Sequence, residues 1–247
     1  MSKAKELEPA NLGITLTSER PSYMNPDNGR GSEDVTSDDI TLPRIEVFQA
    51  LSPQLKKSDP KFIEGAEQGI IFNTLSGELY GDTITFIPIV FRKEYIVWQT
   101  RAAGGGFIGT FPTEVEAEDY RLKLDNPDDH ETNLHAVNFV YVVKANGELE
   151  EAVFSWSRSK LKVHRKLNAL VQMCRGDRFA KAYKLKAVEE KGKKGEYFSY
   201  DVKPLGFVSE EVYVRAENLY KLIRAGERAV AYGTNEDDAP EPESAVM

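Results

Sequence analysis

The sequence has very little cysteine and no long apolar stretch. Of its 247 residues, one is cysteine, Cys174, so no disulfide can form within the chain and a cytoplasmic location is expected. No apolar run approaches the roughly 18 residues that a membrane-spanning helix needs. The N-terminus MSKAKELEPANLG also lacks the apolar core of a signal peptide. The sequence therefore predicts a cytoplasmic protein with no membrane partner.

The spacings of common metal and catalytic sites are also missing. His130, His135 and His164 do not have the spacing of a zinc site or a facial triad. Cys174 and His164 lie too far apart on one predicted helix to act as nucleophile and base. The segment DNPDDHE lacks the pattern of a calcium loop, and AAGGGFIG lacks the Gly-Lys-Ser/Thr of a phosphate-binding loop. We predict no enzyme, no metal and no cofactor, although dispersed acids leave a two-metal nuclease open.

The charge of the chain is strongly segregated. Residues 154–203 contain 14 Lys and Arg against 5 Asp and Glu, a formal charge of +9, within a protein whose net charge is -8. Such segregation creates a local positive field that attracts a polyanion even when the whole molecule is acidic. The pattern indicates nucleic acid as the first candidate partner.

Composition divides the chain into three parts. Residues 1–40 are rich in Ser, Asn, Pro, Gly and acids and predict a disordered N-terminal arm. Residues 41–232 predict one β-rich domain, with order beginning at Ile40. Residues 233–247 contain no base and predict a disordered acidic tail. A tethered polyanion competes with nucleic acid for a cationic groove or docks a partner protein. A solubilising role of the tail is the alternative. The tail acids are Glu236, Asp237, Asp238, Glu241 and Glu243.

Strand patterns dominate the middle of the chain. Residues 62–101 contain β-rich runs, and Pro88 predicts an edge, a bulge or a bend. Residues 135–156 predict a hairpin around Asn146-Gly147, a pair suited to a type I′ turn. Residues 178–208 predict a second hairpin whose tip is KGKKG. In its second strand, Tyr197 belongs to the polar face. We expect an α+β, β-rich fold built on an OB-like antiparallel barrel with inserted and C-terminal helices.

Four helices are expected. A short one lies within residues 38–55 and ends at Ser52-Pro53. A second covers 113–124, with Thr113 as its cap. A third covers 157–174, with Ser155 or Ser157 as N-cap. A fourth begins after Ser209.

The third predicted helix has an apolar stripe opposite a basic one, and no acid occurs between Trp156 and Arg175. The segment RKEYIVWQTR likewise alternates bases with aromatics on a predicted strand, where Trp98 is assigned to the core. Cations track a phosphate backbone and aromatic rings stack on unpaired bases. The predicted nucleic-acid-binding residues are Arg92, Lys93, Tyr95, Arg101, Arg158, Lys162, Arg165, Lys166, Lys184, Lys186, Lys191, Lys193, Lys194 and Tyr197.

From about Ile70 to Met247 the chain resembles tailed-phage single-stranded DNA-binding proteins of OB-fold type. The resemblance depends on FRKEYIVW, WSRSKLKVHRKLN, YKLKAVEEKGKKGEYFSYDV and NEDDAPEPESAVM. It implies a groove for single strands, a tail that guards it or contacts replication or recombination proteins, and the host cytoplasm as location. Tails of that family often end in or near Phe, whereas this one ends in Ala245-Val246-Met247. This difference favours shielding of the groove over docking of partners.

The leading hypothesis is a sequence-nonspecific single-stranded DNA-binding protein of phage origin that acts in replication, recombination or repair. A virion or assembly protein with an extended N-terminal arm is the alternative, and it would form large species without nucleic acid. An annealing or nuclease-associated recombination factor is a third possibility. The sequence leaves DNA or RNA preference, partner proteins and oligomeric state open, with a dimer among the options.

Overall fold

The computed structural model describes residues 23, 30–35, 42–192 and 195–226. The chain divides into a unit over Met1–Val35 and a unit over Thr36–Met247, and the second contains every helix and strand described here. The predicted acidic tail lies outside the described residues, as does most of the predicted N-terminal arm.

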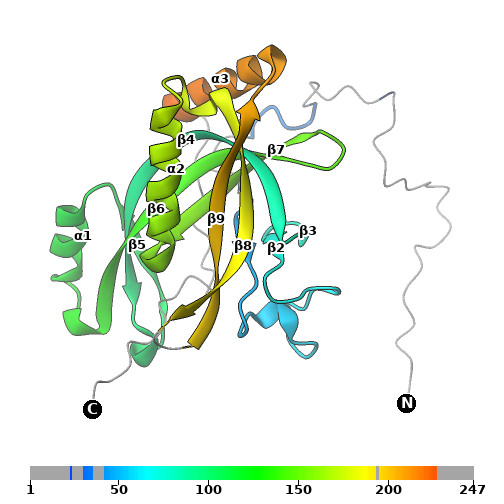
Figure 1. The fold of residues 1–247 in the computed structure, drawn as a ribbon. Coiled ribbons are helices and arrows are strands. Elements are labelled where there is room, and N and C mark those ends of the chain that lie inside the picture. Colours follow the sequence, from blue (N-terminus) through cyan, green and yellow to red (C-terminus); the bar gives the residue numbers. More distant parts are fainter. Residues whose placement is uncertain (1–22, 24–29, 36–41, 193–194, 227–247) are drawn as a thin grey trace, which may run out of the picture. The chain divides into compact units, whose positions relative to one another are not determined.

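The described part of the chain is β-rich, and each α-helix follows two or more strands (Figure 1). The strands are β1 (Ile45–Val47), β2 (Ile71–Asn73), β3 (Leu79–Gly81), β4 (Thr83–Gln99), β5 (Gly106–Phe111), β6 (His130–Val143), β7 (Leu149–Ser157), β8 (Lys181–Gly192) and β9 (Gly195–Phe207). The α-helices are α1 (Glu114–Arg121), α2 (Leu161–Met173) and α3 (Glu210–Ala225). Short 3-10 turns are η2 (Pro53–Leu55), η3 (Arg101–Ala103), η4 (Pro127–Asp129), η5 (Arg158–Lys160) and η6 (Arg178–Ala180).

The central strand of the large sheet is β4, a run of β-branched and aromatic residues that favours extended backbone. The sheet has the order β7-β6-β4-β8-β9, with β5 also paired to β4, and all pairs are antiparallel. β8 pairs with β4 at Thr83–Phe86 and β5 pairs with it at Tyr95–Gln99. η6 packs against β4. As predicted, Pro88 lies at a bulge.

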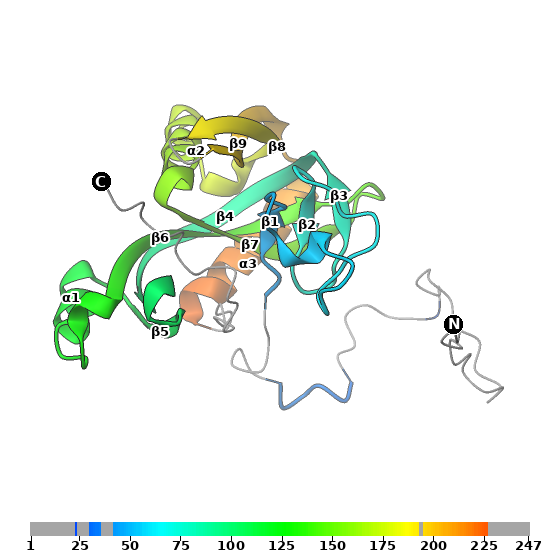
Figure 2. The ribbon, with the colours of Figure 1, turned by 90° about the horizontal axis from the view of Figure 1, so that it is seen from below.

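Each face of the large sheet packs against other elements over part of its area. One face joins β1, β2 and α2 in a core that includes Phe86, Phe154 and Leu167. The opposite face packs against α3 in a second core around Phe139 and Leu219. Figure 2 accordingly shows α2 and α3 on opposite sides of the sheet.

The large sheet curls but does not close into the expected barrel. The edge strands β7 and β9 are not paired with each other within the described residues, although Trp156 of β7 and Tyr200 of β9 have ring centroids 6.2 Å apart. α2 packs against both of these strands. A helix therefore occupies the place where hydrogen bonds would close a barrel. The α+β, β-rich class is confirmed, whereas the sheets are open.

The segment before Ser52 forms a strand, so the helix predicted there is wrong. Ile45 and Val47 alternate toward the core on β1, which pairs with β2 in a small sheet of order β1-β2-β3. β-branched residues at alternate positions favour a strand when a pairing partner is present. That partner lies more than 20 residues away along the chain, beyond the reach of a local pattern.

The hairpin around Asn146-Gly147 is confirmed, but its turn is not type I′. Gly147 has a φ of 86°, whereas Asn146 is not among the residues with positive φ. The Gly147 N–H donates to the Lys144 carbonyl, and the Lys144 N–H donates to Glu148. The connection therefore spans five residues with a glycine bulge, instead of the two that a type I′ hairpin requires.

The predicted caps of α1 and α3 are confirmed, whereas those of α2 are wrong. Thr113 accepts a hydrogen bond from the Glu116 N–H, and Ser209 accepts one from Val212, as expected for caps of α1 and α3. Ser155 and Ser157 do not cap α2, because β7 continues through Ser157 and η5 follows before α2 begins. Pairing of β7 with β6 up to Ser157 outweighs the local capping preference.

Candidate nucleic-acid interface

α2 presents a basic face to solvent. Val163, Leu167 and Val171 are buried on its inner side, while Lys162 and Arg165 are exposed, as is the neighbouring Lys166. This division agrees with the predicted helical stripe. α2 lies beside β9 of the β8–β9 hairpin in Figure 1.

Two lysines of α2 form ion pairs with that hairpin. Lys162 is hydrogen-bonded to Glu190, and Lys166 is hydrogen-bonded to Asp201. These contacts lower the pKa of both carboxyl groups, with the lysine hydrogen bond as the largest cause in each. Exposed pairs of this kind stabilise by no more than about 1 kcal/mol each. The acids lie 28 and 35 residues from their lysines in the sequence, so a local charge count overstates the free positive charge of α2.

A hollow of about 270 Å³ on the β8–β9 hairpin is lined by Lys184, Lys186, Asp201 and Lys203. Lys184 and Lys203 are direct cross-strand partners. Like charges in that position destabilise a sheet, and Lys184 has no ion pair within the described residues. Lys186 Nζ lies 3.5 Å from Asp82 Oδ2, and Lys203 Nζ lies 3.8 Å from Asp201 Oδ2. Three exposed lysines with long or missing ion pairs thus surround one hollow, which we call the lysine hollow.

Lys203 is absent from the predicted set. Apolar and polar residues alternate along β9, and this alternation places Lys203 on the polar face of the strand. The pattern could therefore have identified Lys203 as a candidate. Its position opposite Lys184 depends on the β8–β9 register, which contains a bulge and cannot be read from alternation alone.

A second basic cluster lies between α2 and β4. Arg178 of η6 contacts the Phe91 ring, with its Cζ 5.0 Å from the ring centroid. His164 packs on the same ring at 4.8 Å between centroids. Burial and the charges of Arg178, Lys93 and Arg165 lower the pKa of His164 to about 4. The cations of α2, β4 and η6 therefore meet around one buried, neutral histidine.

Other predicted residues lie elsewhere. Arg92 lies over the Phe139 ring and pairs with Glu94, on the α3 side of the sheet. Arg101 belongs to η3, next to the end of β4 that pairs with β5. Arg158 is bonded to Glu131. These residues do not join the lysine hollow.

The predicted aromatic residues are only partly available for stacking. Tyr197 points to the polar face, as predicted, and its hydroxyl donates to Glu190 at 2.8 Å. Its ring lies against Gly192, where an added Cβ would be 3.1 Å away. Tyr95 is half-buried and Lys191 is exposed. The remaining predicted residues, Lys193, Lys194 and the tail acids, lie outside the described residues.

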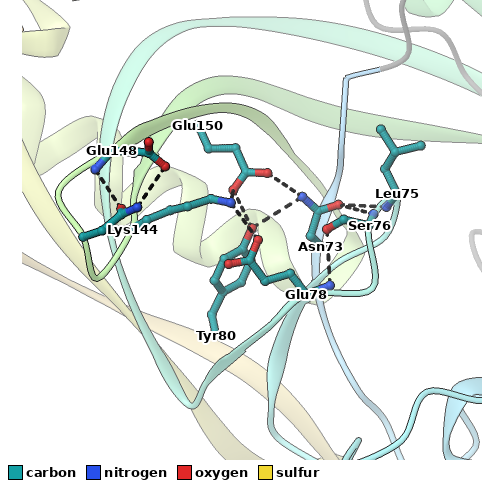
Figure 3. A network of polar contacts seen from close by, with 9 residues as sticks. Asn73, Leu75, Ser76, Glu78, Tyr80, Lys144, Glu148 and Glu150 are labelled. Carbon is teal, nitrogen blue, oxygen red and sulfur yellow. Dashed lines mark hydrogen bonds and ion pairs between the residues drawn. The ribbon is translucent and has the colours of Figure 1, made fainter. Parts of the chain in front are cut away.

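A polar network joins the small sheet to the β6–β7 hairpin (Figure 3). Glu150 accepts hydrogen bonds from Asn73 Nδ2 and the Tyr80 hydroxyl, each at 2.7 Å. Lys144 bridges Glu150 at 3.4 Å and Glu78 at 2.7 Å. Each of these charged groups already has a partner of opposite charge or a hydrogen-bond donor. The network therefore fastens the two sheets together and leaves no group directed at a ligand.

Two observations concern the part of the chain that the structure describes. No group of three or more His, Cys, Asp or Glu is arranged to hold a metal ion in that part of the chain. None of its helices is both long enough and apolar enough to cross a membrane.

The protein thus has an α+β fold with open antiparallel sheets. Its basic surface lies on α2 and the β8–β9 hairpin. Residues 14–229 match the family described as Pam3 phage gp34-like protein, so the chain belongs to this phage protein family. Comparisons with curated proteins and with solved structures gave no match.

Proposed function

We propose that this phage-family protein binds single-stranded DNA without sequence preference, in replication, recombination or repair. The lysine hollow is the observation that carries the proposal. Cross-strand placement of Lys184 and Lys203 costs folding free energy, and a bound anion offsets that cost. The volume of about 270 Å³ lies just below the usual range of small-molecule pockets. It suits a backbone phosphate better than a large organic ligand.

The basic face of α2 extends this surface. Lys162 and Lys166 lie beside the hairpin, while Arg165 lies on the side of the second basic cluster. A strand that crosses α2 would meet cations on both sides of the helix. The ion pairs with Glu190 and Asp201 are exposed and weak, so phosphates can replace these acids as partners of the lysines.

Bases would contact Tyr95 and Tyr197 at the margins of this path. Phosphate contacts carry most of the affinity, because two partly covered rings offer limited stacking surface. We further propose that the tail acids Glu236, Asp237 and Asp238 compete for the same lysines, which would shield the surface in the absence of DNA. An OB-type relationship and a role in the host cytoplasm belong to the same proposal.

Fluorescence anisotropy of a labelled oligothymidine tests the proposal directly. The full-length protein and a chain ending at Tyr232 are titrated at low and moderate salt. We expect binding that weakens with salt and strengthens when the tail is removed. Absence of binding by both chains at low salt would refute the proposal. Large DNA-free assemblies in light scattering would then favour a virion or assembly protein.

A further inference from the structure

The second basic cluster contains a guanidinium group without an acid partner. Arg178 Nη1 donates to Asn168 Oδ1 at 2.8 Å, and Nη2 donates to Asn138 Oδ1 at 3.0 Å. Among the described residues no carboxylate pairs with Arg178. Burial lowers its pKa to about 10, which still leaves the group protonated at neutral pH. A cation in this setting normally has a counter-charge.

The same hydrogen bonds fix the tautomer of His164. Because Asn168 Oδ1 accepts from Arg178, the Asn168 Nδ2 group is left to donate to His164 Nε2, which lies 2.9 Å away. A neutral imidazole that accepts at Nε2 carries its proton at Nδ1. His164 therefore presents an N–H donor at Nδ1, and this atom is buried.

Three buried groups of this cluster lack hydrogen-bond partners in the part of the chain that the structure describes. They are His164 Nδ1, Arg178 Nε and the Tyr183 hydroxyl. Tyr183 interacts electrostatically with Arg178, so it belongs to the same cluster. All three can donate a hydrogen bond, and buried donors without acceptors are costly. The cluster is thus short of acceptors.

The surrounding charge selects an anionic acceptor. Lys93 and Arg165 act electrostatically on His164, and neither has an ion pair within the described ranges. Arg178 is only partly buried, but its Nε is buried together with the other two donors, so an anion reaches all three only when the side chains that cover them move. A group with several anionic oxygens and no donor complements this set of donors.

We infer that His164, Arg178 and Tyr183 bind one phosphate group of the DNA backbone, with Lys93 and Arg165 at the rim. This inference rests on the proposed function and deepens it, because it names a second phosphate position on the side of α2 opposite the lysine hollow. The phosphate oxygens accept from the three donors and neutralise Arg178. Free phosphate offers the same oxygens and serves as an independent probe.

Tyr183→Phe isolates one of these donors, and Tyr200→Phe is its matched control. Both hydroxyls are buried without partners, but Tyr200 interacts with Glu46 and Lys160 instead of Arg178. Removal of either buried hydroxyl should raise the Tm of the free protein by about 2–4 °C, because a buried hydroxyl without a hydrogen-bond partner is destabilising. We expect Tyr183→Phe also to raise the Kd for oligothymidine about three- to tenfold, and Tyr200→Phe to leave it unchanged.

A second arm uses inorganic phosphate and imidazole NMR of the parent protein. Phosphate should shift the His164 Nδ1 resonance, and chloride at equal ionic strength should not. If DNA binds the parent and Tyr183→Phe equally and phosphate leaves His164 unmoved, an ordered water is the acceptor and the inference is wrong, while DNA binding stands. If oligothymidine does not bind the parent, the proposed function fails, and the phosphate arm decides on the anion site alone.

Discussion

Replacing Lys184 and Lys203 together by glutamine should separate stability from binding. The two side chains are cross-strand partners at the lysine hollow, so their repulsion is relieved and the free energy of unfolding should rise by about 0.2–1 kcal/mol. Each phosphate contact to a single strand contributes about 0.7 to the slope of log Kd against log salt. Loss of two contacts lowers that slope by about 1.4. A fourfold increase in salt should then weaken parent binding about sevenfold more than variant binding.

The assay is oligothymidine anisotropy at several salt concentrations, combined with urea unfolding of each protein. Lys56→Gln with Lys57→Gln is the matched control, since it removes the same charge from exposed lysines that follow η2 in the small-sheet region. An unchanged salt slope in the Lys184 and Lys203 variant would refute the reasoning. An equal change in the control would show that net charge, not the lysine hollow, sets the salt dependence.

Two further predictions concern the folded state. Gly69→Ala should lower the free energy of unfolding by about 2–4 kcal/mol, because the φ of Gly69 is +81° and the new Cβ would lie 2.6 Å from the Phe198 ring. Gly81 has the same φ and no neighbour within 4 Å, so Gly81→Ala should cost clearly less in urea unfolding. Equal losses in the two variants would contradict the packing argument. Burial lowers the pKa of His135 to about 3 and that of His164 to about 4, so both stay neutral while the unfolded chain gains protons below about pH 6.5. Stability should fall as the pH drops from about 6.5 toward 4, by about 1.4 kcal/mol per pH unit for each histidine, and imidazole NMR signals that titrate near pH 6.5 would contradict this.

Features governed by neighbouring residues could be predicted from the sequence. The caps Thr113 and Ser209 depend on contacts within three residues. The buried stripe of α2 depends on helical periodicity. The Asn146-Gly147 hairpin depends on turn preference, although its five-residue connection overrode the expected turn type.

Features governed by distant pairing could not be predicted. β1 forms because β2 supplies its partner, and no local pattern contains that information. The same holds for the acids that neutralise Lys162 and Lys166, and for the register that sets Lys203 opposite Lys184. Composition locates the basic segment, but the fold decides which of its charges remain available to a ligand.

Lysine footprinting by acetylation and mass spectrometry, with and without oligothymidine, tests the central claim most directly. The account predicts that DNA protects Lys166, Lys184, Lys186 and Lys203 on α2 and the β8–β9 hairpin, while the exposed Lys56 keeps its reactivity. Protection confined to lysines outside α2, β8 and β9, or no protection at a concentration where binding is saturated, would contradict the account.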